Sequence, residues 1–271
     1  MRTSDGKAPR ALVTGASSGI GAAFARELAT RRCDLVLTAR REDRLCALAE
    51  ELHAQHGIDA LVIAADLSRA DAPMRIAEEL ARRRLHIDVL INNAGYGVPG
   101  NFLASDWQTH EDFIHVLMIA PTELCHRLLP AMRERGYGRI INVGSLAGLI
   151  PGTPAHTLYA AAKSYLVKFS QSLALENRAQ GVKVCALCPG FTYSEFHDVT
   201  GARQKVSRMP GYLWMRADEV VRLGLDAVER GRIVYVTGRV NRAIKVLFDL
   251  LPDRLALKVI ARRARHFRVE K

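Results

Sequence analysis

Short apolar runs alternate with amphipathic stretches along this chain of 271 residues. The runs are three to six residues long, which is typical of strands that are buried on both faces of a parallel sheet. The intervening stretches place apolar residues three or four positions apart, which predicts helices that cover the sheet. The pattern therefore predicts an α/β fold with a doubly wound parallel sheet. The six predicted strands cover 11–14, 35–38, 60–64, 89–91, 140–143 and 182–187.

Three predicted helices have bounds that the pattern defines. A polar helix covers about 42–56, a long helical stretch spans roughly 107–134, and a third helix runs from Tyr159 to about Asn177. No repeat or low-complexity segment interrupts the alternation, so the strands and helices form one domain.

The composition fits a globular chain, with 49% hydrophobic and 25% charged residues. No apolar run reaches the ~18 residues of a membrane span, and the N-terminus MRTSDGKAPR lacks the apolar core of a signal peptide, so we expect a cytoplasmic protein. The net charge is +11, but ten basic and three acidic residues lie within 239–271. The excess charge is thus concentrated near the C-terminus, and no aromatic-basic interleaving supports nucleic-acid binding.

The five cysteines are scattered, and their odd number predicts free thiols in a reducing compartment. Cys185 and Cys188 match C-x-x-C, but they lie in a strand-like run where these two positions point to opposite faces. We interpret both as core residues, and we expect no metal site.

A glycine-rich turn follows the first predicted strand, with Gly15, Gly19 and Gly21 in the spacing G-x-x-x-G-x-G. Missing side chains let the backbone approach a pyrophosphate, and the N-terminus of the next helix offers free N–H groups and a partial positive charge. A strand, a glycine-rich turn and a helix in this order predict a dinucleotide site.

The second predicted strand ends at Ala39-Arg40, where the ribose of an adenosine lies in such folds. An acidic residue there would favour NAD, whereas the guanidinium of Arg40 suits a 2′-phosphate and favours NADP. The alternative interpretation is a surface arginine on a basic protein.

Two further strand ends carry candidate ligand contacts. Asp66, after the third strand, would bond an adenine amino group or cap the next helix. Small and amide residues follow the fourth strand in the run Asn92-Asn93-Ala94-Gly95, which fits a ligand crevice at the carboxyl ends of the strands.

Tyr159 and Lys163 are four residues apart on a predicted helix, so their side chains share one face. An ammonium about 4 Å from a phenol, at an effective dielectric of ~20, is worth up to roughly 4 kcal/mol, or about 3 pKa units. The pair can therefore act as an acid and base near neutral pH. The alternative is a packed ring beside a solvated charge.

Four motifs in order make the sequence similar to the short-chain dehydrogenase/reductase family. They are TGASSGIG at 14–21, NNAG at 92–95, YAAAK at 159–163 with Ser145 before it, and PGFT at 189–192. The resemblance implies a seven-stranded Rossmann sheet within a domain at 8–240, with 233–236 as the seventh strand. It also implies NADP(H) as the cofactor and a carbonyl or alcohol as the substrate.

The resemblance implies a role for each matching residue. Tyr159 would be the general acid, Lys163 would lower the pKa of Tyr159 and bond the nicotinamide ribose, and Ser145 would polarise the substrate oxygen. The remaining cofactor contacts would come from strand ends and the glycine-rich turn: Gly15, Ser17, Ser18, Gly19, Ile20, Gly21, Arg40, Asp66, Leu67, Asn93, Ala94, Gly95, Pro189, Gly190 and Thr192.

One position departs from the family. Leu117 stands where members usually have an asparagine that holds a water of the proton relay, and His115 and Asn142 are polar residues nearby in sequence. This departure favours the alternative function, an NADP(H)-binding regulatory or scaffold protein without turnover. The presence of Ser145, Tyr159 and Lys163 together favours an oxidoreductase, because a protein without turnover has no need of all three.

The C-terminal third is expected to set the substrate and the partners. Aromatic and methionine side chains in 191–216 predict either a lid over a fairly apolar substrate or simple packing against the core. The segment 241–271 predicts a basic amphipathic helical tail, which would contact an anionic membrane surface, dock on the domain or meet a second subunit. The resemblance also implies a homo-oligomer.

Overall fold

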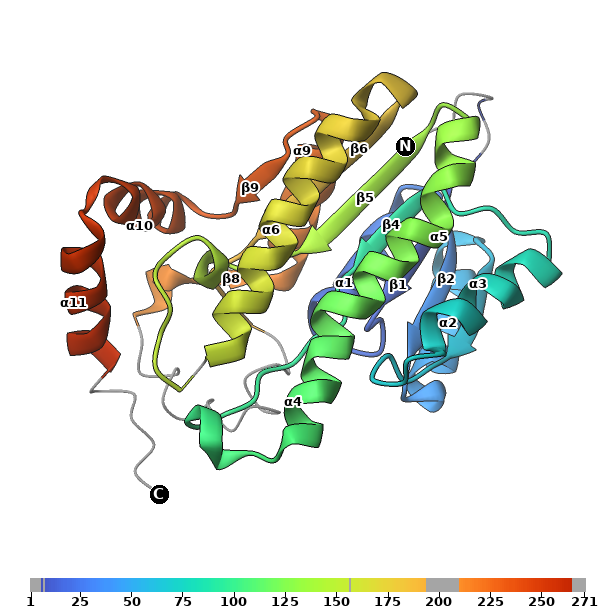
Figure 1. Cartoon of the computed structure of the whole chain (residues 1–271). Helices are drawn as coiled ribbons and strands as arrows, with labels where there is room; N and C mark the ends of the chain where they lie inside the picture. The colour runs from blue at the N-terminus through green and yellow to red at the C-terminus, as the bar shows by residue number, and fades with distance from the viewer. Residues whose placement is uncertain (1–5, 7, 156, 194–209, 265–271) are drawn as a thin grey trace.

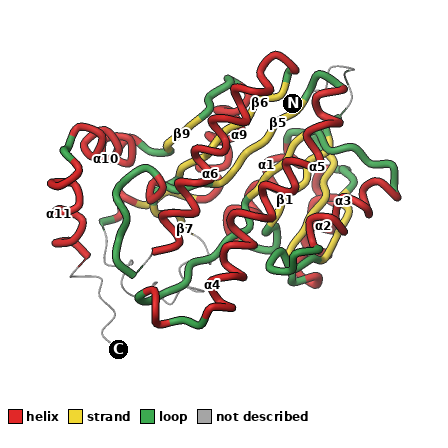
Figure 2. The backbone as a smooth tube through the Cα atoms, viewed as in Figure 1, coloured by secondary structure: helices red, strands yellow, loops and turns green. Residues whose placement is uncertain are grey.

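A computed structural model of the chain describes residues 6, 8–155, 157–193 and 210–264. Its centre is a sheet of seven parallel strands in the order β3-β2-β1-β4-β5-β6-β9, seen as the yellow segments of Figure 2. The strand order reverses direction between β1 and β4, which creates the crevice of a doubly wound sheet. The strands are β1 (Arg10–Thr14), β2 (Asp34–Ala39), β3 (Ala60–Ala64), β4 (Val89–Asn92), β5 (Gly138–Val143), β6 (Val182–Cys188) and β9 (Val234–Val236).

Successive residues of β1 enter different cores, which explains why the strand is apolar throughout. Ala11 and Val13 join a core with the helices of one face, whereas Leu12 joins the core of the other face. The first face is covered by α1 (Gly19–Thr30), α2 (Glu42–His56) and α9 (Ala217–Glu229). The second is covered by α3 (Ala72–Arg82), α4 (Trp107–Ile114), α5 (Ala120–Glu134) and α6 (Thr157–Asn177), of which α5 and α6 cross in front of the sheet in Figure 1.

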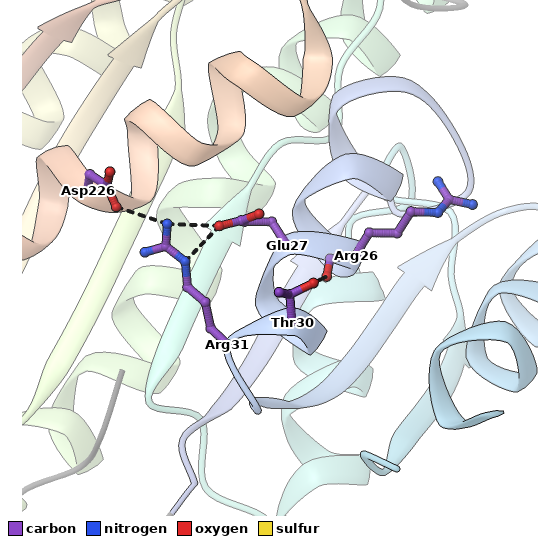
Figure 3. A network of polar contacts seen from close by, with 5 residues as sticks. All are labelled: Arg26, Glu27, Thr30, Arg31 and Asp226. Carbon is purple, nitrogen blue, oxygen red and sulfur yellow. Dashed lines mark hydrogen bonds and ion pairs between the residues drawn. The ribbon is translucent and has the colours of Figure 1, made fainter. Parts of the chain in front are cut away.

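Ion pairs hold α1 against a helix from the far end of the chain. Arg31, just after α1, donates to Glu27 and to Asp226 of α9, each at 2.9 Å (Figure 3). Arg26 of the same helix makes two bonds of 2.8 Å to Glu51 of α2. The helix that follows the glycine-rich turn is therefore fixed on both sides.

The long helical stretch predicted over 107–134 is two helices joined by a π-helical segment. The π-helix η2 (His115–Ile119) separates α4 from α5. The apolar spacing continues through this insertion, with Val116 and Leu117 buried, so the sequence pattern gives no sign of it. Such insertions are rare and are frequent at functional sites.

Two structures follow the sixth strand, and the apolar pattern predicts each of them only in part. A two-stranded parallel sheet pairs β7 (Phe191–Tyr193) with β8 (Trp214–Arg216), and the segment 194–209 of the predicted lid lies outside the described residues. The tail forms α10 (Arg239–Leu250) and α11 (Asp253–Ala264), which extend as an arm away from the sheet (Figure 1). Pro252 lies between these helices.

The doubly wound sheet predicted from the sequence is confirmed. All six strands predicted from the apolar runs are present, and the strand expected at 233–236 is observed as β9. The second helix has the predicted bounds of Glu42–His56. None of the helices among the described residues is long and apolar enough to cross a membrane.

Candidate active site

The predicted site residues gather where the carboxyl ends of four strands meet at one edge of the sheet. Gly15 follows β1, Asn93 follows β4, Ser145 follows β5 and Pro189 follows β6. Tyr159 and Lys163 come from the start of α6, which packs on β6 and on the short turn after Ser145. The structure thus collects residues that are far apart in sequence at the switch point of the sheet.

Tyr159, Lys163 and Ser145 form one cluster. The Ser145 hydroxyl lies close enough to the Tyr159 phenol to lower its pKa, and it accepts the backbone N–H of Ala147 at 3.1 Å. The Lys163 ammonium lies 5.6 Å from the centre of the Tyr159 ring and donates to the Val143 carbonyl at 2.7 Å. A buried cation, a phenol and a hydroxyl therefore share one corner of the site.

Gly148 lets the turn that carries Ser145 approach α6. A Cβ at this position would lie 2.5 Å from the carbonyl carbon of Lys163, which is far inside van der Waals contact. The close approach places Ser145 beside the first turns of the helix.

Burial governs the pKa values of this cluster. It raises the pKa of the Tyr159 phenol, which the Ser145 hydroxyl lowers in part. It also lowers the pKa of Lys163 to about 8. The protein groups alone therefore do not bring the pKa of Tyr159 below its ordinary value, contrary to the effect expected of Lys163. Burial is the larger effect on this phenol and outweighs the lowering by Ser145.

The turn after β1 fits the phosphates of a dinucleotide. Ser18 caps α1 without a side-chain hydrogen bond to the helix, and the first turn of α1 has no acidic residue. The N–H groups and the positive end of the helix dipole are thus not opposed by the protein itself. Gly15 and Gly19 adopt φ values of +66° and +55°, and a Cβ at Gly21 would lie 2.1 Å from the Gly15 oxygen. Ser17 and Ile20 complete the turn.

Thr14 holds this turn against the end of β4. Its hydroxyl accepts the backbone N–H groups of Asn93 and Ala94 at 2.9 and 3.0 Å and donates to Ile91 at 3.2 Å. The Asn93 amide returns a bond to the Thr14 carbonyl at 2.9 Å. The predicted contacts Asn93 and Ala94 are therefore positioned by a threonine to which the sequence analysis gave no role.

The end of β2 presents two arginines, and it is the second that reaches the glycine-rich turn. Arg41 donates to the hydroxyl of Ser18 at 2.8 Å and to that of Ser17 at 3.1 Å. Arg40, the residue chosen from the sequence, is exposed. Successive side chains leave a strand end in different directions, which explains why neighbouring arginines differ in this way.

Asp66 and Leu67 follow β3, at the side of the site where an adenine is expected. The Asp66 carboxylate accepts the N–H of Ser68 at 3.0 Å, and α3 begins only at Ala72. Asp66 therefore closes a local turn, and it does not cap the next helix. Leu67 is buried in the core beneath this turn.

The turn after β6 is locked to the beginning of the C-terminal arm. Leu146 donates its N–H to the Pro189 carbonyl at 2.9 Å, and Thr192 donates to the Gly190 carbonyl at 3.2 Å. A Cβ at Gly190 would lie 2.5 Å from the amide of Asn241 on α10. Asn241 is buried and bonds the Thr237 carbonyl at 2.8 Å, and no sequence motif pointed to it.

Leu117 occupies the interior, where Thr14 and Asn92 line a small cavity together with it. It is 1% exposed within the π-helix, and its Cγ would lie 3.6 Å from a Cβ at Gly95. Asn142 accepts from Asn92 at 2.8 Å and donates to Ser170 at 2.8 Å. The side chain of Asn142 is thus engaged in a buried polar network of the sheet.

A cavity opens beside Tyr159, on the side of α4. It is lined by the loop after β4, by α4 and by the start of α6, with four apolar side chains, four polar side chains and one glycine: Val98, Gly100, Asn101, Phe102, His110, Phe113, Thr157, Leu158 and Tyr159. The cavity adjoins the Tyr159 phenol. The sequence analysis named none of these residues except Tyr159, because they share neither a motif nor a helical period.

Comparisons with known proteins identify relatives of this chain. The sequence model of a family described as short chain dehydrogenase matches residues 9–205. The very-long-chain 3-oxoacyl-CoA reductase of Anas platyrhynchos is 35% identical over 195 residues, which are 70% of this chain and 62% of that protein. The chain thus spans less than two thirds of that relative. Nodulation protein G of Rhizobium sp. (strain N33) is 33% identical over 235 residues, 85% of this chain and 93% of that protein.

A solved structure is similar over most of its length. A short-chain dehydrogenase from Sphingobium yanoikuyae in complex with NADPH is 32% identical, with a TM-score of 0.79, over 90% of this chain and 96% of that one. The family match over residues 9–205 includes the strands β1 to β6 and the cluster of Ser145, Tyr159 and Lys163.

Proposed function

The chain belongs to the short-chain dehydrogenase/reductase family, and from this premise we propose that it is an oxidoreductase that transfers a hydride between NADP(H) and a largely apolar carbonyl or alcohol. The observation that carries the proposal is the cluster of Ser145, Tyr159 and Lys163 beside a cavity lined by both apolar and polar side chains. The neighbour solved with NADPH supports the choice of cofactor.

The proposed chemistry assigns a proton to the protein and a hydride to the cofactor. NADPH supplies the hydride when it is bound. The Tyr159 phenol donates its proton to the carbonyl oxygen, and the Ser145 hydroxyl donates a hydrogen bond to the same oxygen. Lys163 holds a positive charge at the base of the cluster, where burial makes it act more strongly than in water.

The phosphates and the adenosine are assigned to the other half of the crevice. We propose that the N–H groups at the start of α1 bind the pyrophosphate and that Asp66 and Leu67 face the adenine. Asn93, Ala94 and Gly95 would contact the cofactor from β4, and Pro189, Gly190 and Thr192 would hold the nicotinamide end. The absence of a capping bond at Ser18 supports this assignment.

The test of the function is NADPH oxidation over aldehydes, ketones and 3-oxoacyl thioesters, the last because of the name of one relative. NADPH binding is measured separately by thermal shift. Turnover of any member supports the oxidoreductase. Tight NADPH binding with no turnover would favour the alternative function, an NADP(H)-binding regulatory or scaffold protein. Leu117, in place of the usual asparagine, is the residue that favours this alternative.

Replacing Arg41 with alanine is expected to raise the Kd for NADPH about 10- to 100-fold and to leave the Kd for NADH unchanged. A charge-assisted bond to the 2′-phosphate contributes roughly 1.5–3 kcal/mol, and Arg41 already lies on the serines of the turn. Fluorescence titration of both nucleotides measures the effect. The Kd of Arg40→Ala for NADPH shows which of the two arginines contacts the 2′-phosphate. Arg69→Ala is the control, and its Kd for both nucleotides should equal that of wild type. An equal loss for NADPH and NADH would contradict a phosphate contact.

We also propose that the C-terminal arm binds an anionic membrane surface. Val246, Leu247 and Leu250 of α10 are 53%, 56% and 78% exposed, and Leu255 and Leu257 of α11 are 51% and 54% exposed. The segment 239–271 has ten basic and three acidic residues. A two-fold contact between two copies of this arm would place its charge against itself, whereas anionic headgroups complement the charge and lipid covers the leucines.

Vesicle flotation of the full-length protein tests this contact. Leu247→Asn combined with Leu250→Asn is expected to weaken binding to phosphatidylglycerol vesicles by roughly 10- to 100-fold, because two exposed leucines lose contact with lipid. Leu175→Asn, on the equally exposed Leu175 of α6, is the matched control and should bind as wild type does. Binding that survives the double substitution would overturn the proposal.

The homo-oligomer implied by the resemblance stays a prediction, which light scattering would test against the 30.0 kDa of one chain.

A further inference from the structure

The cavity beside Tyr159 includes a histidine that the proposed chemistry does not use. His110 lies in α4 and is 5% exposed. Its ring lines the same cavity as the Tyr159 side chain. A substrate whose carbonyl meets the phenol would extend its substituents along this lining.

The His110 ring is held on one edge and one face. Its Nε2 lies 2.7 Å from the backbone carbonyl of Phe102, and the ring stacks on the Phe102 ring with centroids 4.7 Å apart and planes 12° apart. A carbonyl oxygen only accepts hydrogen bonds, so Nε2 carries the hydrogen. In the neutral imidazole, Nδ1 is therefore an acceptor.

That acceptor is unsatisfied within the protein. Nδ1 of His110 is buried and has no hydrogen-bond partner among the residues that the structure describes. Leaving a buried acceptor without a partner costs about 1–3 kcal/mol, and buried polar atoms are almost always bonded. A fixed ring beside the phenol, with a buried acceptor that none of the described residues satisfies, is the form of a ligand contact.

We infer that His110 forms a specificity subsite, in which Nδ1 accepts a hydrogen bond from a hydroxyl or amide N–H on the substrate. The inference rests on the proposed function, because it names a second polar group on the same carbonyl substrate. The substrate class is then an apolar ketone or aldehyde with a hydrogen-bond donor along its chain. Asn101 and Thr157, which also line the cavity, add polar groups on the same lining.

Site-directed variants separate the two nitrogens of His110. In His110→Gln, the side-chain amide can still donate to the Phe102 carbonyl, but nothing replaces the acceptor at Nδ1. In His110→Asn, the shorter amide places an acceptor near the position of Nδ1. The two variants thus differ in the acceptor while both keep a polar side chain in α4.

The substrates are matched pairs, namely 2-alkanones of five to nine carbons and their ω-hydroxy derivatives, and kcat/KM is measured with NADPH. We expect wild type to prefer at least one hydroxy ketone over its partner by about 10- to 100-fold, mainly through KM, as a bond to an otherwise unpaired buried group gives. His110→Gln should lose the preference without losing activity on the plain ketone. His110→Asn should retain part of it.

The outcomes distinguish this inference from the proposed function. Equal kcat/KM within every pair, or a preference that His110→Gln leaves unchanged, overturns the subsite while the reductase stands. A preference for ω-carboxylates over ω-hydroxyls, measured in the same series, also overturns it, because it would require a protonated His110 that donates at Nδ1. NADPH binding with no turnover of either series contradicts the proposed function and removes the premise of the subsite.

Discussion

Replacing Tyr159 with phenylalanine is expected to lower kcat by about 10²- to 10⁴-fold while NADPH binding stays within a few-fold of wild type. The range is what a positioned general acid contributes. Phenylalanine keeps the ring that packs beside Lys163 and removes only the hydroxyl that meets Ser145. Single-turnover oxidation of NADPH with a ketone that wild type reduces would measure the loss.

Tyr165→Phe is the matched control on the same helix. The Tyr165 hydroxyl pairs with the Thr122 hydroxyl at 2.7 Å, and its ring stacks on Phe169. Its removal should cost about 1 kcal/mol of unfolding free energy and leave kcat near wild type. If Tyr159→Phe retained most of the kcat, the assignment of the general acid would be wrong. Equal losses in the two variants would indicate a general disturbance of α6.

Replacing Lys163 with methionine is expected to change how the stability of the cofactor-free protein depends on pH. The folded-state pKa of Lys163 is about 8, lowered from 10.5 by burial. Between these values the unfolded chain holds a proton that the folded protein has released, so raising the pH favours folding. Wild type should therefore gain about 2–3 kcal/mol relative to Lys163→Met between pH 8 and pH 10.5.

The comparison must be a difference between the two proteins, measured by denaturant unfolding over a pH series. Burial raises the pKa of Cys125, Cys185 and Cys188 to about 12. Each thiol then releases its proton more readily in the unfolded chain, which weakens folding as the pH rises above 9. Cys125 and Cys185 do not interact with Lys163, so their contributions cancel in the difference. The Cys188 thiol does interact with Lys163, so Cys188 is replaced with alanine in both proteins. A difference that stays flat from pH 7.5 to 10.5 would show that Lys163 titrates normally.

The layers of the fold were predictable because each strand contains a short, mostly apolar run and the intervening segments have apolar residues at helical spacing. Both properties are local, and β1 shows the cause in its alternating contacts with two cores. The π-helix at His115–Ile119 was not predictable, since it inserts one residue into a turn without breaking the apolar spacing. The three-residue strands β7 and β8 are too short to leave a period.

The site was predictable where a motif follows a strand. The resemblance selected Gly15, Asn93, Ser145 and Pro189, and the structure places them at one edge of the sheet. The rest depends on contacts between distant segments. Arg41 reaches serines 23 and 24 residues earlier, and Asn241 meets Gly190 from another helix.

His110 shows a different limit of sequence reasoning. In the sequence it is one of nine histidines, with no neighbour that suggests a ligand. Only the structure shows that Phe102 fixes one nitrogen and leaves the other open. A single hydrogen bond thus converts an ordinary core histidine into a candidate contact.

The central position of β1 has a consequence for the order in which the chain folds during its synthesis. β1 leaves the ribosome first, pairs early with β2, and offers its other edge only to β4, which begins 75 residues after β1 ends, at Val89 after Thr14. Until β4 emerges, the nascent sheet exposes an open strand edge, which is the feature that draws other chains into aggregates. The hydroxyl of Thr14 has no amides of Asn93 and Ala94 to bind before that moment. The glycine-rich turn after β1 is therefore made early, and it becomes rigid only after β4 and the residues that follow it have been synthesised.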